Sequence, residues 1–241
     1  MSYARWSRLL VLVAVPALAA LAVAGCSSGG PSPQAAQAAA NNVANTSTQA
    51  AYTASQLRHA LLVKINGYPP ATPVESGAYG SLAEVKATRN SMKGVTVVPA
   101  NCAQTTVTGF SSPAFTNVPA TAETFRVGSN GVSEVLLAPS PSTAALALGK
   151  RVSAGCSRFR ATVHRRTFTY TVREKAVRGI GVAARVMNIK ATGPATINVW
   201  SVVYRASNFV GAVTIVGPAA SQNVIVTLAA QAYAHAVKTL H

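Results

Sequence analysis

The sequence predicts an α+β fold: an antiparallel β-sheet with helices packed on one face, preceded by a signal peptide and a flexible tether. Several apolar segments in the second half of the chain alternate with short turns, as half-buried strands do. Residues 221–240 carry an unbroken helical stripe of apolar side chains. The first 50 residues have no such periodicity beyond one apolar run.

The N-terminus has the organisation of an export signal. Arg5 and Arg8 precede an apolar run at residues 9–24, which is shorter than the roughly 20 residues that a spanning helix needs. The run ends in Val23-Ala24-Gly25-Cys26, which resembles a bacterial lipobox. We therefore expect residues 1–25 to be a lipoprotein signal peptide and Cys26 to carry the lipid. An ordinary secretory signal with an incidental cysteine is the alternative.

Residues 26–52 are predicted to form a tether between this anchor and one folded domain at residues 53–241. The tether is rich in Ser, Thr, Pro, Ala, Asn and Gln, and it has no charged residue. Glycosylation of this segment is a hypothesis. Two acyl chains or more would hold the protein stably on the outer face of the cytoplasmic membrane, in the cell envelope.

The first part of the domain offers weaker signals. Leu57, Leu61 and Leu62 have helical spacing and predict a helix over residues 54–64. The proline-rich residues 67–73 predict a loop, and a second short helix is expected at residues 81–90. Residues 95–98 are expected to be extended, and residues 110–119 to form a loop.

The second part of the domain is dominated by predicted strands. Residues 124–128 and 132–138 flank Ser129-Asn130-Gly131, a good hairpin signal. Residues 141–154 predict a helix that ends just before Cys156. Residues 158–163 and 167–172 alternate in opposite parity, which requires a turn or bulge at His164-Arg165-Arg166. Three consecutive antiparallel strands are predicted at residues 183–191, 196–206 and 209–216.

The last helix is the most regular predicted element. Its apolar stripe consists of Ile225, Leu228, Ala229, Ala232, Tyr233, Ala236, Val237 and Leu240. Ser221 is the expected N-cap. An interfacial membrane helix needs many basic residues on its polar side, whereas this one has only Lys238, so the stripe is predicted to pack on the sheet.

The three cysteines fit an oxidising compartment. With Cys26 assigned to the anchor, Cys102 and Cys156 remain as an even pair, and we predict one disulfide between them, worth roughly 4 kcal/mol. Two buried free thiols are the alternative.

The composition argues against catalysis. All five acidic residues are glutamates, so aspartyl catalysis and a Ser/His/Asp triad are excluded. The four histidines are far apart in sequence, and no metal motif, phosphate loop or nucleophile motif occurs. Glu123 and Glu134 could face each other across the hairpin, but two exposed strand glutamates are the more ordinary interpretation. We predict no enzyme activity, no metal and no cofactor.

Basic residues are concentrated in one region. The formal net charge is +16, and 11 of the 21 Lys and Arg residues lie between residues 150 and 190. The candidate anion-binding residues are Arg158, Arg160, His164, Arg165 and Arg166. Anionic lipid headgroups or acidic envelope polymers are the reachable partners, whereas nucleic acid is disfavoured by the compartment. A solvated face without a ligand is an equally strong interpretation.

Several segments together resemble the PknH-like extracellular sensor domain of mycobacteria. The matching pieces are Val98-Pro99-Ala100-Asn101-Cys102, a helix at residues 144–154 running into Gly155-Cys156, the stretch Val199-Trp200-Ser201-Val202-Val203-Tyr204, and the C-terminal helix. The resemblance covers roughly residues 54–241 and implies a sheet-and-helix domain with a ligand-binding cleft and no active site. Kinase-linked members of that family have two disulfides, whereas this sequence has cysteines for one, and it contains no kinase domain.

The leading functional hypothesis is a membrane-anchored extracytoplasmic lipoprotein whose sensor-like domain binds a small-molecule or anionic envelope ligand. The first alternative is a carrier of envelope lipids, which needs a large apolar cavity; aromatic residues make up only 6% of the chain. The second is a basic scaffold that binds anionic envelope components. An enzyme ranks last.

Overall fold

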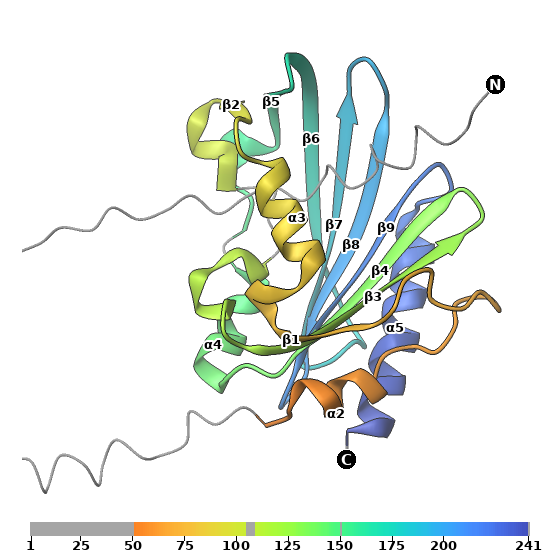
Figure 1. Ribbon diagram of the computed structural model, residues 1–241. Coiled ribbons are helices and arrows are strands. Elements are labelled where there is room, and N and C mark those ends of the chain that lie inside the picture. Colours follow the sequence, from red (N-terminus) through yellow and green to blue (C-terminus); the bar gives the residue numbers. More distant parts are fainter. Residues whose placement is uncertain (1–50, 105–108, 150, 241) are drawn as a thin grey trace, which may run out of the picture. The chain divides into compact units, whose positions relative to one another are not determined.

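The computed structural model describes residues 51–104, 109–149 and 151–240. The predicted signal peptide, the predicted lipid attachment site Cys26 and nearly all of the predicted tether lie outside these residues, as do Lys150 and His241. Within the described part, one antiparallel sheet organises the chain (Figure 1). This confirms the predicted α+β class.

The sheet has nine strands in the order β1-β3-β4-β9-β8-β7-β6-β5-β2. Every neighbouring pair is antiparallel. The strands are β1 (Glu75–Ala78), β2 (Thr96–Val98), β3 (Pro119–Val127), β4 (Asn130–Leu137), β5 (Arg158–Val163), β6 (Arg166–Val177), β7 (Ala183–Thr192), β8 (Ile197–Arg205) and β9 (Val210–Val216). The predicted run of three strands corresponds to β7, β8 and β9 and is confirmed.

The β3–β4 hairpin is confirmed, but its turn lies earlier than the Asn-Gly pair. Val127 pairs with Asn130, so the turn consists of Gly128, with φ of 59°, and Ser129. Asn130 begins β4 and stabilises the turn instead. Its Nδ2 donates to the Val127 carbonyl at 3.3 Å, and its Oδ1 accepts from the Ala219 amide at 3.0 Å.

The turn expected between β5 and β6 is also present. His164 and Arg165 have φ values of 47° and 65°, as a two-residue hairpin turn requires, and Val163 pairs with Arg166. Arg166 is therefore the first residue of β6. This pairing accounts for the change of parity between the two strands.

The helices are shorter than predicted in two places. α2 (Ala54–His59) begins with a capping box between Thr53 and Gln56 and ends before residue 64. The helix predicted at residues 141–154 is wrong beyond residue 148. α4 (Pro141–Ala145) continues only into the 3₁₀ helix η6 (Leu146–Leu148), because Gly149 has φ of 54° and ends the turn.

The remaining helices agree better with the prediction. α3 (Ala83–Ser91) matches the short helix expected at residues 81–90. α5 (Gln222–Thr239) follows the expected N-cap, whose hydroxyl accepts from the Val224 amide at 3.4 Å. Short 3₁₀ helices connect the strands: η2 (Tyr79–Ser81), η3 (Ala100–Gln104), η4 (Gly109–Ser111), η5 (Pro113–Phe115) and η7 (Ala154–Cys156). Among the described residues, no helix has the length and apolarity that a membrane crossing requires.

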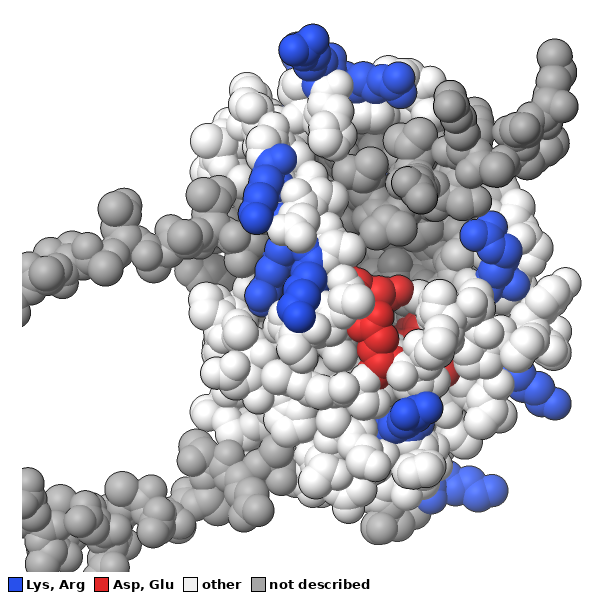
Figure 2. Space-filling view, viewed as in Figure 1, with Lys and Arg blue, Asp and Glu red and all other residues white. Residues whose placement is uncertain are grey.

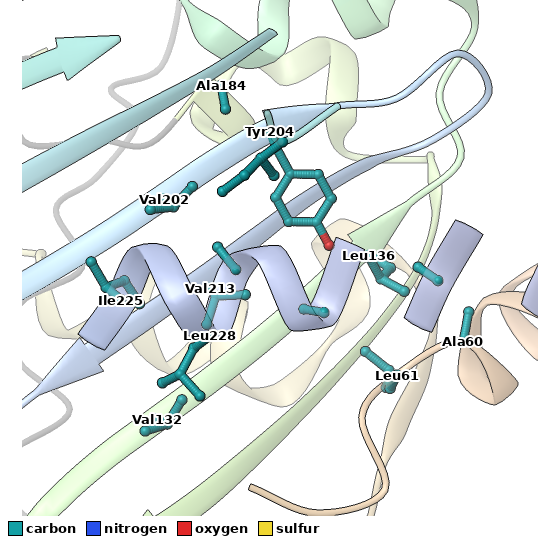
Figure 3. Close-up of a cluster of buried hydrophobic side chains, with 14 of the residues drawn as sticks. Ala60, Leu61, Val132, Leu136, Ala184, Val202, Tyr204, Val213, Ile225 and Leu228 are labelled. Atoms are coloured by element: carbon teal, nitrogen blue, oxygen red, sulfur yellow. The ribbon is translucent and has the colours of Figure 1, made fainter. Parts of the chain in front are cut away.

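Apolar cores lie on both faces of the sheet. α5 and α2 pack on one face over Val132, Val202 and Val213, as predicted for the last helix (Figures 1 and 3). We call this the α5 face. On the opposite face, α4, η5 and η6 cover the β3–β4–β9–β8 end of the sheet around Val203 and Ala212. Helices therefore cover both faces, which extends the one-sided arrangement expected from the sequence.

The third core lies at the β5–β6–β7 end, also opposite the α5 face. Phe159 stacks on Tyr170 there, with ring centroids 5.2 Å apart and the two rings 3° from parallel. The predicted disulfide between Cys102 and Cys156 is present and buried in this core, with the Cα atoms 5.2 Å apart. It joins η3 to η7, and η7 leads directly into β5.

Candidate functional site: a polar corner of the sheet

The alternation of side chains along β5 and β6 shows on which face of the sheet each candidate basic residue lies. Phe159 and Ala161 are buried in the core opposite the α5 face. Because side chains alternate along a strand, Arg158 and Arg160 point to the α5 face, where both are exposed. Arg158 and Arg160, which have the same parity in the sequence, therefore share one face of the sheet.

The other three candidates are not brought to the same place. His164 and Arg165 form the hairpin turn, and both are exposed. Arg166 shares the parity of Phe168 and Tyr170 on β6, so it lies on the opposite face from Arg158 and Arg160. The five residues therefore do not form one anion-binding cluster.

Two basic residues that were not among the candidates lie beside Arg158 and Arg160. The pairing register aligns Arg158, Thr171, Lys190 and Asn198 across β5, β6, β7 and β8. Arg173, two residues after Thr171, shares its face. Both Arg173 and Lys190 are exposed. Their positions follow from parity once the register of β6 and β7 is known, and the sequence alone does not give that register.

We define the polar corner as the part of the α5 face that lies beyond α5, on β5, β6 and the adjoining ends of β7 and β8. Its members are Arg158, Arg160, Thr169, Thr171, Arg173, Asn188, Lys190 and Asn198. All are exposed or half-buried. The opposite side of the same strands is buried and apolar, so this end of the sheet has one packed face and one hydrated face.

Hydrogen bonds order the inner edge of the polar corner. Asn188 Nδ2 donates to Asn198 Oδ1 at 2.8 Å and to the Val199 carbonyl at 3.0 Å. Asn198 Nδ2 donates to the Ala220 carbonyl at 2.9 Å, next to the N-cap of α5. The two asparagines therefore connect the polar corner to the beginning of α5.

Glu174, which follows Arg173 in the sequence, does not neutralise the polar corner. Glu174 lies on the opposite side of β6, where Arg185 Nη1 donates to its Oε2 at 3.3 Å and the Val152 amide donates to its Oε1 at 3.1 Å. This is the one ion pair found among the described residues.

Figure 2 shows a face of the molecule on which acidic side chains gather in one place while Lys and Arg are spread out.

A second polar group lies beneath α2 and α5, and it corrects the sequence interpretation. Glu123 and Glu134 are direct cross-strand partners on the α5 face, as considered from the sequence, but they are buried instead of exposed. The Leu62 amide, just after α2, donates to Glu134 Oε2 at 3.1 Å. One oxygen of each carboxyl group has no hydrogen-bond partner in the described part of the chain.

Burial controls the ionisation of this pair. Desolvation, increased by the neighbouring Glu134 carboxyl, raises the pKa of Glu123 from 4.5 to about 8. Desolvation likewise raises the pKa of Glu134 from 4.5 to about 7, and the Leu62 amide opposes this rise. The pair is therefore partly protonated at neutral pH and titrates as a unit.

Tyr204 completes the buried polar group. Its ring lies over Gly211, its cross-strand partner on β9, where any larger residue would overlap the ring. Figure 3 shows the hydroxyl directed toward Leu136 under α5. Burial, and next the nearby Glu134 carboxyl, raise the pKa of this phenol well above its ordinary value. The Tyr204 hydroxyl has no hydrogen-bond partner among the described residues.

The described residues offer little for catalysis or metal binding. No cluster of three His, Cys, Asp or Glu side chains occurs in the described part of the chain. The two paired carboxyl groups are sealed beneath helices, away from any substrate in solution. The polar corner, in contrast, offers guanidinium, ammonium, hydroxyl and amide donors at the surface, a set suited to binding an anion.

Comparison with known proteins supports the fold. No protein-family model matches the sequence, and no curated protein matches it significantly. Among solved structures, the extracellular domain of PknH from Mycobacterium tuberculosis is similar, with a TM-score of 0.50 and 14% identity over 80% of this chain and 98% of that one. An uncharacterised Mycobacterium smegmatis protein, described as an Rv0999 ortholog, has a TM-score of 0.39 and 14% identity over 61% of this chain and 77% of that one. The chain therefore has a PknH-like fold.

Proposed function

We propose that the chain is a lipid-anchored extracytoplasmic binding domain that senses or captures a ligand and catalyses no reaction. The fold likeness to the extracellular domain of a mycobacterial kinase supports the extracytoplasmic location. The buried Cys102–Cys156 disulfide fits an oxidising compartment. The lipobox-like sequence ending in Cys26 supports the anchor.

The observation that carries the binding role is the polar corner. Its exposed cations lie on a sheet whose opposite side carries a packed apolar core, and the described acidic residues of the α5 face, Glu123 and Glu134, are buried at the other end of the sheet on β3 and β4. A rigid backbone holds binding groups in fixed positions, which reduces the entropy lost when a ligand is ordered. Surface binding of an anion is therefore the activity to which this arrangement is best suited.

A lipid carrier is less well supported. The buried apolar residues of the described part pack against one another as three cores, each formed between sheet and helices or loops. Such packing uses the apolar surface for stability and leaves it unavailable to an acyl chain.

Anchoring and ligand binding are tested separately in the native host. Cys26→Ser is expected to move the protein from the membrane fraction to the soluble extracytoplasmic fraction, because the acylated thiol is its attachment. Retention of the variant on the membrane would contradict the anchor. Native mass spectrometry of the wild-type protein is expected to show a small anionic adduct; a co-purifying neutral lipid would favour a carrier instead.

A further inference from the structure

Thr171 lies at the centre of three basic residues in the polar corner. Arg158 and Lys190 are its direct partners on the two neighbouring strands, and Arg173 follows two positions later on β6. Neighbouring strands are about 4.8 Å apart, so the Cα atoms of Arg158 and Lys190 are about 10 Å from each other with Thr171 between them. The long side chains of all three can converge above the threonine hydroxyl.

These three cations have no ionic partner in the described part of the chain. The one described ion pair, Arg185–Glu174, lies on the other side of the sheet. On the same face, Thr169, Asn188 and Asn198 are neutral, and the further cations Arg160 and Lys175 follow Arg158 and Arg173 on their strands. The cations therefore repel one another across a hydrated surface, and an anion placed between them would relieve that repulsion.

The inner edge of the site is joined to the beginning of α5. Asn198, next to Lys190 in the register, donates to the Ala220 carbonyl just before the Ser221 N-cap. The edge of the site is thus ordered by hydrogen bonds before a ligand arrives.

We propose that Arg158, Arg173 and Lys190 hold a phosphate group above Thr171, so that the ligand of this binding domain is a phosphate-bearing molecule. A phosphate group offers three strong acceptor oxygens and up to two negative charges, which three cations and one hydroxyl can satisfy together. The inference rests on the proposed binding function and specifies its ligand. The phosphate could belong to a lipid headgroup or to a free phosphate compound.

Sodium tripolyphosphate and vesicles serve as the two probes. The full chain carrying Cys26→Ser is titrated with tripolyphosphate in about 0.1 M salt, where charges more than about 10 Å apart are screened. In parallel it is mixed with vesicles of phosphatidylglycerol and phosphatidylcholine, with pure phosphatidylcholine as the control. The test variants are Arg173→Gln and Lys190→Gln. The matched control is Arg166→Gln, which removes the same charge from the same strand but on the opposite face.

Each test variant is expected to weaken phosphate binding about tenfold, since a charge-assisted hydrogen bond is lost. Arg166→Gln is expected to stay within about twofold, because it contributes only screened long-range attraction. This pattern with tripolyphosphate assigns a free phosphate compound, and the same pattern with vesicles alone assigns a lipid headgroup. Equal losses in Arg166→Gln and Arg173→Gln, or no binding to either probe, would overturn the proposal.

All three replaced side chains are exposed, so thermal unfolding is expected to be the same as in the parent chain. Failure of this proposal leaves the anchor untouched, because membrane retention through Cys26 has its own readout. Retention without selective phosphate binding would refute the ligand assignment alone.

Discussion

The buried Glu123–Glu134 pair should make the stability of this protein fall as the pH rises. Both folded-state pKa values lie above the ordinary value of 4.5, at about 8 and about 7. Between pH 4.5 and the folded-state pKa of each group, the folded protein holds a proton that the unfolded chain has released. The stability due to the pair is therefore complete below pH 4.5 and is lost as the pH rises through 7 and 8.

Glu134→Gln is the perturbation that isolates this effect. The amide oxygen of glutamine can still accept from the Leu62 amide, and its NH₂ group can donate to Glu123. A pKa raised from 4.5 to about 7 corresponds to about 3 kcal/mol. We expect the variant to be about 3 kcal/mol more stable than wild type at pH 8 and similar to it near pH 4.5.

The assay is urea unfolding from pH 4.5 to pH 9, followed by circular dichroism and by the fluorescence of Trp200. Glu75→Gln is the control, because Glu75 lies outside the pair. Its carboxylate accepts a hydrogen bond from the Ala83 amide. It should preserve the steep wild-type pH dependence. If Glu134→Gln unfolds with the same pH dependence as wild type, the argument from burial is wrong.

Three further predictions concern the structure that supports the site. Gly211→Ala should lower the free energy of unfolding by about 2–4 kcal/mol in thermal melts, because its Cβ overlaps the Tyr204 ring; unchanged melting would refute the close packing on β9. The double variant Cys102→Ala with Cys156→Ala should lose about 4 kcal/mol in urea, since the bridge closes a long loop, and the loss should equal that of the wild type under reduction. Asn130→Ala should lower the free energy of unfolding by about 1–3 kcal/mol, because it leaves the Ala219 amide without its acceptor. Replacing the exposed Ser129 in Ser129→Ala should change the stability little, and equal effects of the two variants would contradict the role assigned to Asn130.

The strands and the last helix were predictable because their periodicity is local. Apolar residues of β7, β8 and α5 recur at spacings that only one backbone conformation can place on one face. The helix predicted at residues 141–154 ends early because Gly149 adopts a positive φ, and a glycine at this position is a local signal for the end of a helix.

The site depended more on contacts between distant segments. Parity alone placed Arg158 and Arg160 on one face, but Arg173 and Lys190 joined them only through the pairing register of β5, β6 and β7. Similarly, the glutamate pair could be foreseen across the hairpin, whereas the amide that donates to Glu134 belongs to Leu62, which lies 72 residues earlier in the chain. No local pattern in the sequence specifies either arrangement.

Phosphate binding by the polar corner can be located residue by residue by titrating ¹⁵N-labelled protein with tripolyphosphate and following the backbone amide resonances. We expect the largest shifts in β6 around Thr171, in β5 at Arg158 and in β7 at Lys190, and we expect Arg173→Gln to need about tenfold more tripolyphosphate to reach them. Shifts confined to the His164–Arg165 turn or to α3 and α4, or an unchanged titration midpoint in the Arg173→Gln variant, would contradict phosphate binding at the polar corner.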